Sequence, residues 1–462
     1  MAKKNLLFIF GDQHRFCDLG CYGNQVIQTP NLDSLAREGV LLKHAYTNCP
    51  VCVPARGTLL TGRYPLRHGA VTNDLPVNPD VPGIADFLNA AGYETAYIGK
   101  WHLGGIPRDR YIPENERLGF RYWRGCNCNH DYYHAWYDDN ENQRHRIDGY
   151  EPLAQTALAE EFIRSQSGSK PWAMYVSYGT PHEPYELVPE EYLQRYPEDI
   201  PFRDNVRLPA MLAKDRPVDR ETLKRWYRGY YAHISALDEQ IGRILKTLEE
   251  TGLRENTIVV YTSDHGDMLG SQGMTNKQLP HEESSHIPFL IAGPGIIPEC
   301  RDQLFSLADA APTMLSLLGV PYEGMDGMDC SRIFLDPKAP GNDSIYMMEY
   351  IPCHQSFDRG IPEWRAVRNH RYLYAATPSY PEELLFDLET DPLQLRNLAG
   401  NPAFRPKKEN MAVLLKQWVS KTDRFLPWDT FIPHYGLTKA WNRSQAYFGL
   451  PILNTENTET EE

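Results

Sequence analysis

The stretch Leu6-Leu7-Phe8-Ile9-Phe10-Gly11-Asp12-Gln13 is an apolar run that ends in a glycine and two polar side chains. A short, continuous apolar run of this kind indicates a strand buried on both faces, as in a parallel sheet. Comparable strands are predicted at 93–98, 172–177, 257–262 and 287–292. Helices with apolar residues three or four apart are predicted between them, at 30–38, 54–60, 84–91 and 221–251. This alternation predicts an α/β fold with a mostly parallel central sheet sandwiched by helices.

The pattern changes after about residue 335, where the loop-like segment Lys338-Ala339-Pro340-Gly341-Asn342 ends the alternation. Short strands joined by tight turns are predicted at 345–350, 364–368, 372–376 and 384–387, and a helix follows at 407–422. We therefore expect an α/β domain at 1–337, a small C-terminal subdomain with an antiparallel sheet and a helix at 338–450, and an acidic tail at 451–462.

The composition excludes some classes of protein. The chain has 462 residues, 41% of them hydrophobic, which is enough to build a large core. Its 47 Lys and Arg against 61 Asp and Glu leave a net charge of −14, which argues against a general nucleic-acid binder. A local basic pocket for an anionic substrate is still compatible with an acidic exterior. No apolar stretch has the length of a membrane span.

The N-terminus and the cysteines bear on the compartment. Met1-Ala2-Lys3-Lys4 is followed by a short apolar run with no small-residue cleavage site, unlike a secretory signal. We therefore expect a cytoplasmic protein, or a periplasmic one if a signal segment has been removed. The nine cysteines, an odd number, do not indicate a disulfide framework.

Polar side chains follow one predicted strand after another. Asp12 and Gln13 follow the first strand, and the others are Lys100, His102, His182, Asp264, His265 and, ahead of the last strand, Lys277. Because ligands bind beyond the carboxyl ends of the strands of an open α/β sheet, we expect these groups to meet at one edge. Two carboxylates with an amide and an imidazole suit a divalent cation. Two lysines and two histidines suit an oxyanion such as sulfate or phosphate.

The segment Cys52-Val53-Pro54-Ala55-Arg56 places a cysteine just ahead of a predicted helix. A thiol at a helix N-terminus has a lowered pKa and can act as a nucleophile. The alternative is a buried structural cysteine.

This segment, with Thr61-Gly62-Arg63 beyond it, resembles the signature of the type I, formylglycine-dependent sulfatases of the alkaline phosphatase superfamily. Residues 20–23 and 29–33 resemble the opening of that family, and Gly99-Lys100-Trp101-His102-Leu103-Gly104 resembles its second signature. Ser263-Asp264-His265-Gly266-Asp267 resembles its metal segment, and 385–398 its C-terminal subdomain. The resemblance implies an alkaline phosphatase-like fold and a catalytic domain at 1–337. It also implies hydrolysis of a sulfate monoester, which we expect on a carbohydrate.

The family's chemistry implies a role for each matching residue. The motif cysteine, Cys52 here, is oxidised to formylglycine, which hydrates to a geminal diol. One hydroxyl attacks sulfur and displaces the alcohol; the other then loses a proton and expels sulfate. Arg56 would hold the diol, and Lys100 and Lys277 would neutralise sulfate oxygens. His102 would take the proton that releases sulfate, and His182 would be the general acid to the leaving alcohol.

The resemblance also implies what binds. One divalent metal ion would be held by Asp12, Gln13, the modified Cys52, Asp264 and His265. The implied partners are a small sulfated substrate, expected to be a glycan fragment, and a formylglycine-generating or radical SAM maturation enzyme. Neither nucleic acid nor a membrane is expected.

Two residues depart from the pattern of many sulfatases, which carry aspartate where Gln13 stands and asparagine where His265 stands. The pair also resembles the phosphonate monoester hydrolases, relatives that use the same formylglycine. Calcium is the expected metal, with manganese or magnesium as alternatives, because a nitrogen ligand suits manganese better than calcium. A phosphonate monoester or phosphodiester is the alternative substrate. A further alternative is a non-catalytic anion-binding homologue in which Cys52 stays a thiol.

The Tyr- and His-rich segment 126–137 is predicted to line the leaving-group pocket, where Tyr132, Tyr133 and Trp136 would stack on a sugar ring. A packed surface loop is the alternative. A zinc site of Cys126, Cys128, His130 and His134 is another, although the single residue between the cysteines is unlike the usual spacing. His354 and Arg359, in the predicted subdomain, could reach the same pocket.

Overall fold

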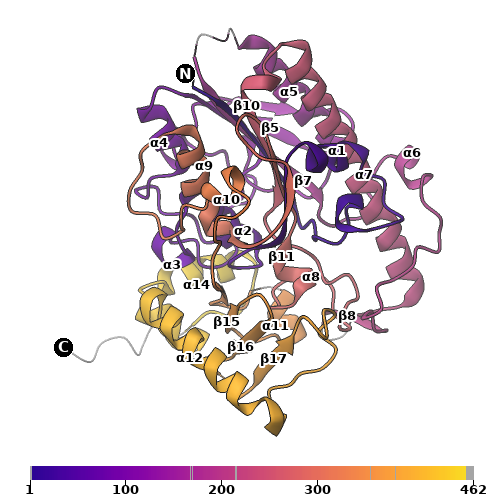
Figure 1. Ribbon diagram of the computed structural model, residues 1–462, viewed down its shortest axis with the longest axis vertical. Coiled ribbons are helices and arrows are strands. Elements are labelled where there is room, and N and C mark those ends of the chain that lie inside the picture. The colour runs from indigo at the N-terminus through magenta and orange to yellow at the C-terminus, as the bar shows by residue number, and fades with distance from the viewer. Residues whose placement is uncertain are drawn as a thin grey trace.

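The computed structural model describes residues 3–166, 168, 170–213, 216–353, 355–379 and 381–453. A large central sheet has helices on both faces, and the last part of the chain, which ends in yellow, forms a smaller unit at one end (Figure 1). Among the described residues, no helix is both long and apolar enough to cross a bilayer.

Eleven strands of the described chain form the central sheet, in the order β11-β2-β12-β10-β1-β7-β3-β4-β5-β6, with β13 paired to β2. They are β1 (Asn5–Asp12), β2 (Val40–Tyr46), β3 (Glu94–Lys100), β4 (Tyr122–Cys126), β5 (Trp136–Asp138), β6 (Arg144–Arg146), β7 (Trp172–Pro181), β10 (Thr257–Ser263), β11 (His286–Ile287), β12 (Phe289–Ala292) and β13 (Glu299–Ser306). The neighbours β10, β1, β7, β3 and β4 are parallel, which confirms the mostly parallel sheet.

One strand prediction needs correction. The predicted strand at 287–292 is two strands, β11 and β12, separated at Pro288, which has no N–H to give to a ladder. β12 runs antiparallel to β10, so this edge of the sheet departs from the parallel alternation.

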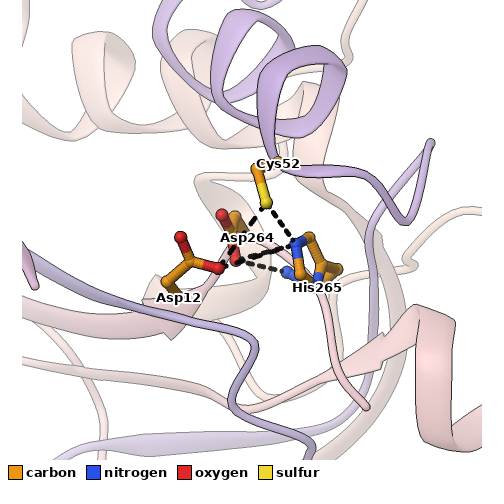
Figure 2. Close-up of side chains that lie close together, drawn as sticks. All are labelled: Asp12, Cys52, Asp264 and His265. Atoms are coloured by element: carbon orange, nitrogen blue, oxygen red, sulfur yellow. Dashed lines mark hydrogen bonds and ion pairs between the residues drawn. The ribbon is translucent and has the colours of Figure 1, made fainter. Parts of the chain in front are cut away.

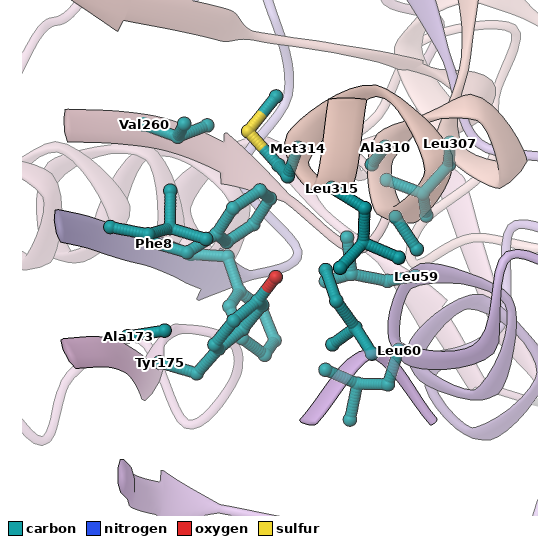
Figure 3. Packing of buried hydrophobic residues seen from close by; sticks show 14 of the residues in the cluster. Phe8, Leu59, Leu60, Ala173, Tyr175, Val260, Leu307, Ala310, Met314 and Leu315 are labelled. Carbon is teal, nitrogen blue, oxygen red and sulfur yellow. The ribbon is translucent and has the colours of Figure 1, made fainter. Parts of the chain in front are cut away.

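Helices cover both faces of the sheet, as predicted. One face packs against α1 (Pro30–Glu38), α5 (Glu151–Ser165) and α7 (Arg220–Glu250). On the other face, Phe8, Tyr175 and Val260 point from the strands toward residues of α2 (Cys52–Thr61) and α9 (Ala310–Leu318), among them Leu59 and Met314 (Figure 3). The helix α4 (Ile84–Ala90) joins this second layer.

The small C-terminal sheet is antiparallel, in the order β14 (Ile345–Glu349), β15 (Trp364–Arg368), β16 (Tyr372–Ala376) and β17 (Glu383–Asp387), as predicted. The predicted helix is α12 (Arg405–Thr422), and it packs on this sheet with two helices that were not predicted, α13 (Trp428–His434) and α14 (Thr438–Tyr447). The other face of the small sheet packs against Tyr46 and Leu304 of the large domain. The boundary at 337/338 stays a prediction, and most of the predicted tail lies outside the described residues.

Short elements complete the fold: α3 (Pro65–His68), α6 (Glu190–Leu193), α8 (Glu282–Ser285), α10 (Arg332–Leu335), α11 (Gln355–Arg359) and the hairpin of β8 (Ala210–Ala213) and β9 (Arg216–Val218). The long helix α7 begins where the Asp219 carboxylate accepts a hydrogen bond from the Thr222 N–H, and it stops just before Gly252, whose φ is 68°.

Candidate active site

The polar side chains predicted at the strand ends do gather at one edge of the central sheet. Asp12 ends β1 and Lys100 ends β3, while Asp264 follows β10 and His182 follows β7. Because these four strands are parallel neighbours, their carboxyl ends lie side by side.

Four buried residues bring their donor atoms within 4.8 Å of one another: Asp12, Cys52, Asp264 and His265 (Figure 2). His265 Nε2 lies 3.1 Å from Cys52 Sγ, 3.6 Å from Asp264 Oδ1 and 3.7 Å from Asp12 Oδ1. Two carboxylates and an imidazole converging in this way are a donor set that fits a divalent cation. Among the described residues this is the one group of His, Cys, Asp and Glu gathered so closely.

Two cations compensate the buried carboxylates. Arg56 is fully buried in α2; its Nη2 lies 3.0 Å from Asp12 Oδ2 and its Nε 3.0 Å from Asp264 Oδ2. Lys100 Nζ lies 2.6 Å from Asp12 Oδ2. Burial alone would raise the pKa of Asp12, but the positive charges of Lys100, Arg56 and Lys277 hold that pKa well below its usual range. Asp12 is therefore ionised at neutral pH.

Gln13 stands among these charges in a strained backbone conformation, with φ of 72°. Its side-chain oxygen accepts a hydrogen bond from Lys277 Nζ, and its Nε2 donates to Asp267 Oδ2 at 2.6 Å. Its backbone N–H donates to Asp264 Oδ1 at 3.0 Å. The side-chain amide thus links Lys277 to Asp267, and the role of Gln13 as a metal ligand stays a prediction.

Cys52 is the first residue of α2 and is only 1% exposed. The prediction of a lowered thiol pKa is wrong: burial, and then the negative charge of Asp12, raise the pKa of Cys52 to about 11. The favourable position at the helix start and the nearby lysines do not outweigh the loss of water. The unmodified side chain is therefore a protonated thiol at neutral pH, and a poor nucleophile.

The two histidines that the sequence assigned to proton transfer, His102 and His182, line the same cavity as Cys52. His102 has a φ of 59°, and its two ring nitrogens are buried without a partner among the described residues. Burial and the charges of Lys100 and Arg108 hold its pKa well below the usual value. The ring of His182 is held at both nitrogens, with Nδ1 2.7 Å from Glu183 O and Nε2 2.8 Å from Lys277 Nζ. Burial and the charge of Lys277 likewise lower the pKa of His182.

A cavity of about 450 Å³ opens over Cys52 and is lined by His102, His182 and Lys277. Its outer wall includes Arg108 and Phe448, which the sequence did not single out. The Arg108 guanidinium lies 5.0 Å from the centre of the Phe448 ring, and its Nε and Nη2 bond Asp74 at 2.7 and 2.9 Å. The cavity therefore joins a cationic, imidazole-rich end near Cys52 to a partly aromatic outer end.

The 126–137 segment contributes to this cavity differently from the prediction. His130, a member of the segment predicted to line the pocket, does line the cavity, whereas Tyr133 and Trp136, which were expected to stack on a sugar, do not. Tyr132 is buried, and its hydroxyl lies 2.8 Å from Gly179 O and 2.6 Å from His182 O, so it fixes the chain at His182 instead of stacking on a sugar. The zinc alternative is not supported, because its four side chains do not converge as a metal-binding group.

Arg359 contacts the site indirectly, by binding the loop that carries Lys277. Its Nη2 donates to Lys277 O and to Gln278 Oε1, each at 3.0 Å, and so holds the loop that carries Lys277. His354 lies outside the described residues.

Comparisons with known proteins agree with this geometry. The sulfatase family model matches residues 4–320, and the model of the C-terminal part of N-sulphoglucosamine sulphohydrolase matches residues 270–421. The chain is 36% identical over 454 residues to an ulvan-active sulfatase of Formosa agariphila, covering 96% of this chain and 86% of that protein. The crystal structure of the yidJ protein of Bacteroides fragilis superposes with a TM-score of 0.82 and 30% identity, covering 92% of this chain and 97% of that chain.

A phosphonate monoester hydrolase of Agrobacterium radiobacter shares the fold, with a TM-score of 0.75, 24% identity, and coverage of 91% of this chain and 96% of that chain. The sulfatase model covers more than half of the chain, and its span includes each of the strand-end residues described above. The chain therefore belongs to the sulfatase family of the alkaline phosphatase superfamily and is a sulfuric ester hydrolase.

Proposed function

We propose that this protein hydrolyses a sulfate monoester on a carbohydrate, using a formylglycine made from Cys52 and one divalent metal ion. The observation that carries the proposal is the position of Cys52 Sγ, beside Asp12, Asp264 and His265 and at the floor of a cavity that also contains Lys277. The carbohydrate is supported by the similarity to a sulfatase that is active on ulvan.

The metal would be held by Asp12, Asp264, His265 and the modified Cys52, with Gln13 as a further ligand if its amide turns away from Lys277. Most of these donors are oxygens, so calcium is the metal we propose; the His265 nitrogen favours manganese as an alternative, and magnesium, which also binds oxygen ligands, is another. When bound, such an ion acts as a Lewis acid and lowers the pKa of a coordinated hydroxyl.

The proposed modification would replace the Cys52 thiol, which is a poor nucleophile at neutral pH, by a better one. With its pKa raised to about 11, Cys52 would rarely be ionised at neutral pH. A hydrated formylglycine supplies a hydroxyl for attack and a second hydroxyl whose deprotonation expels sulfate, so that no stable ester remains on the enzyme.

The remaining roles follow from the contacts. Lys277 lines the cavity, and Lys100 lies against Asp12 and the cavity residue His130, so we assign both ammonium groups to neutralising sulfate oxygens as charge develops. His102 has a lowered pKa and is neutral, as a proton acceptor must be. The Arg56 guanidinium donates its described hydrogen bonds to Asp12, Asp264, Ser177 and the carbonyl of Lys100. We therefore propose that Arg56 holds the two carboxylates in place. Its contact with the diol stays a prediction.

Mass spectrometry of the peptide that contains Cys52, from protein made in its native host, tests the nucleophile. Conversion of the cysteine to formylglycine lowers the mass by about 18 Da, as the exchange of SH and H for a carbonyl oxygen in the nucleophile requires. The modified protein should hydrolyse members of a panel of sulfated mono- and disaccharides, and Cys52→Ala should fold but lose turnover. An unmodified peptide would favour the non-catalytic alternative, in which Cys52 remains a thiol.

A second candidate, hydrolysis of a phosphonate monoester or phosphodiester, is favoured by one observation. Gln13 and His265 occupy places where the residues resemble those of phosphonate monoester hydrolases, and the fold is shared with one of them. Aryl sulfates and aryl phosphonates with the same leaving group, assayed side by side on modified protein, separate the candidates. Sulfate turnover that is absent or far slower than phosphonate turnover would overturn the first proposal and support the second.

A further inference from the structure

Two lysine–imidazole pairs meet at the wall of the cavity above Cys52, which His130, His182 and Lys277 line. Lys277 Nζ lies 2.8 Å from His182 Nε2, and Lys100 Nζ lies 3.1 Å from His130 Nε2. A lysine ammonium has only donors, so each imidazole accepts at Nε2 and holds its proton on Nδ1. The two imidazole rings are stacked, with centroids 4.4 Å apart and planes 12° apart. His130 thus contacts both Lys100, its partner in one pair, and the ring of His182, which belongs to the other pair.

We infer that His130 is a positioning residue for sulfate ester hydrolysis: its Nε2 orients the ammonium of Lys100, and its ring face fixes the plane of His182. The inference rests on the proposed function, which assigns Lys100 to the sulfate oxygens, and on the role that the family resemblance implies for His182, which is to face the leaving alcohol.

The hydrogen bonds of Lys100 show why an acceptor at this point matters. The ammonium has three N–H groups on a flexible four-carbon stem. One of them points to Asp12 Oδ2, at 2.6 Å, and a second to His130 Nε2. With two directions fixed, the third N–H is fixed as well, and it is the one that remains for a substrate oxygen. Without His130, the ammonium could turn about the single bond to Asp12.

The contacts of His182 show why a stacked ring matters. The partners at Nδ1 and Nε2, Glu183 O and Lys277 Nζ, both act at the edge of the ring. Bonds at the edge restrain rotation within the ring plane, whereas a flat neighbour on the face restrains tilting. His130 supplies that neighbour, and a positional error of about 1 Å in a reacting group can reduce the rate 100-fold.

The loop that carries His130 is held without its imidazole, so variants at this position should fold. The Asn129 side chain bonds both sides of the turn: its Nδ2 donates to Asp131 O at 2.8 Å, and its Oδ1 accepts from the Asp131 N–H at 3.2 Å. His134 offers a matched control, because it is an exposed histidine of the same loop, bound only to Asp131 in the described structure and absent from the cavity wall.

Three substitutions separate the contact of His130 with Lys100 from its contact with His182. His130→Gln keeps a side-chain oxygen as acceptor for Lys100 but loses the stacked ring, whereas His130→Phe keeps the ring but loses the acceptor. His130→Ala loses both. Each variant is loaded with metal, its formylglycine content is measured by mass spectrometry, and kcat and KM are normalised to that content.

The kinetics are measured on aryl and sugar sulfates with leaving groups of different pKa, together with the dissociation constant of inorganic sulfate from calorimetry. His130→Phe should bind sulfate about tenfold more weakly, as expected for one lost charge-assisted contact, and should keep the wild-type dependence on leaving-group pKa. His130→Gln should keep the sulfate affinity and lose kcat mainly on poor leaving groups, by about 10–100-fold. His130→Ala should show both defects, and His134→Ala neither.

Equal effects of Phe, Gln and Ala on sulfate affinity and on every leaving group would overturn the inference, since a residue that only lines the cavity would behave in that way. The proposed function can fail separately. Wild-type protein that contains formylglycine and turns over no sulfate ester would overturn that proposal alone. The sulfate affinities of the Phe and Gln variants would still decide whether His130 orients Lys100.

Discussion

Replacing Arg56 by methionine tests how the carboxylates of the site are held in the protein interior. Methionine occupies a comparable volume but carries no charge, so Asp12 and Asp264 each lose a contact of 3.0 Å. Asp12 keeps Lys100 at 2.6 Å. For Asp264, the remaining ion-pair partner in the described chain is His265, whose pKa is lowered by burial, so that the ring is neutral. Asp264 is therefore the residue left without a cation.

The size of the effect follows from this count. Breaking a buried ion pair by removing one partner costs about 3–5 kcal/mol, because a charge stays buried without compensation. Since Lys100 still serves Asp12, we expect one such cost and not two, that is, about 3–5 kcal/mol less free energy of unfolding in protein freed of metal at pH 7. Added divalent metal should recover part of this loss, because the cation would stand beside Asp264.

Urea unfolding followed by tryptophan fluorescence provides the measurement, on wild type, Arg56→Met, Asp264→Asn and the double variant. An amide at position 264 needs no cation. The double variant should therefore lose less free energy of unfolding than the two single variants together, with a coupling of about 2 kcal/mol or more. A loss below about 1 kcal/mol for Arg56→Met, or additivity within about 0.5 kcal/mol, would refute the reasoning.

Three further predictions concern metal, pH and the support of His182. Chelation should lower the Tm, and calcium, manganese or magnesium at about 100 times its Kd should restore about 2.7 kcal/mol; a Tm that responds to none of them would contradict a metal site. Burial, opposed by Lys100, raises the pKa of Glu151 from an ordinary 4.5 to about 8. Its protonated form is thus favoured in the fold, and stability should fall by about 1.4 kcal/mol per pH unit between pH 5 and 8. Urea unfolding across this range should show that Glu151→Gln lacks that slope, and an identical slope would exclude Glu151 as its source. Tyr132→Phe should cost about 1–3 kcal/mol and lower kcat, because two buried carbonyl groups lose a donor; exposed Tyr133→Phe is the control, and equal effects in urea unfolding and in turnover would contradict the assigned role.

The fold and the inner end of the site are predictable because their determinants are local. An apolar run such as 6–10 indicates a buried strand, and a polar residue directly after it, such as Asp12, must lie at the strand's carboxyl end. The parallel arrangement then brings Lys100 and Asp264 to the same edge without further information. The resemblance of the 52–63 segment to a known signature supplied the chemistry.

The rest depends on packing between distant segments. The pKa of Cys52 is raised because strands and helices close over it, and a pattern of neighbouring residues does not show that burial. His130 could have been found as a histidine within the predicted pocket loop, although nothing local distinguished it from His134. Phe448 had no signal at all, because the two C-terminal helices α13 and α14 lie beyond the part of the sequence with clear periodicity.

The wall formed by Arg108 and Phe448 has a consequence for how such an enzyme can diverge. The anion end of the cavity is built on the ends of β1, β3, β7 and β10, which cannot shift without disturbing the central sheet. Phe448, by contrast, directly follows α14 near the end of the described chain, and Arg108 sits in the connection after β3. Mutations, insertions or deletions there reshape the outer wall while the residues at the strand ends keep their positions. Selection can therefore change which leaving group the outer cavity accepts without rebuilding the residues at the strand ends.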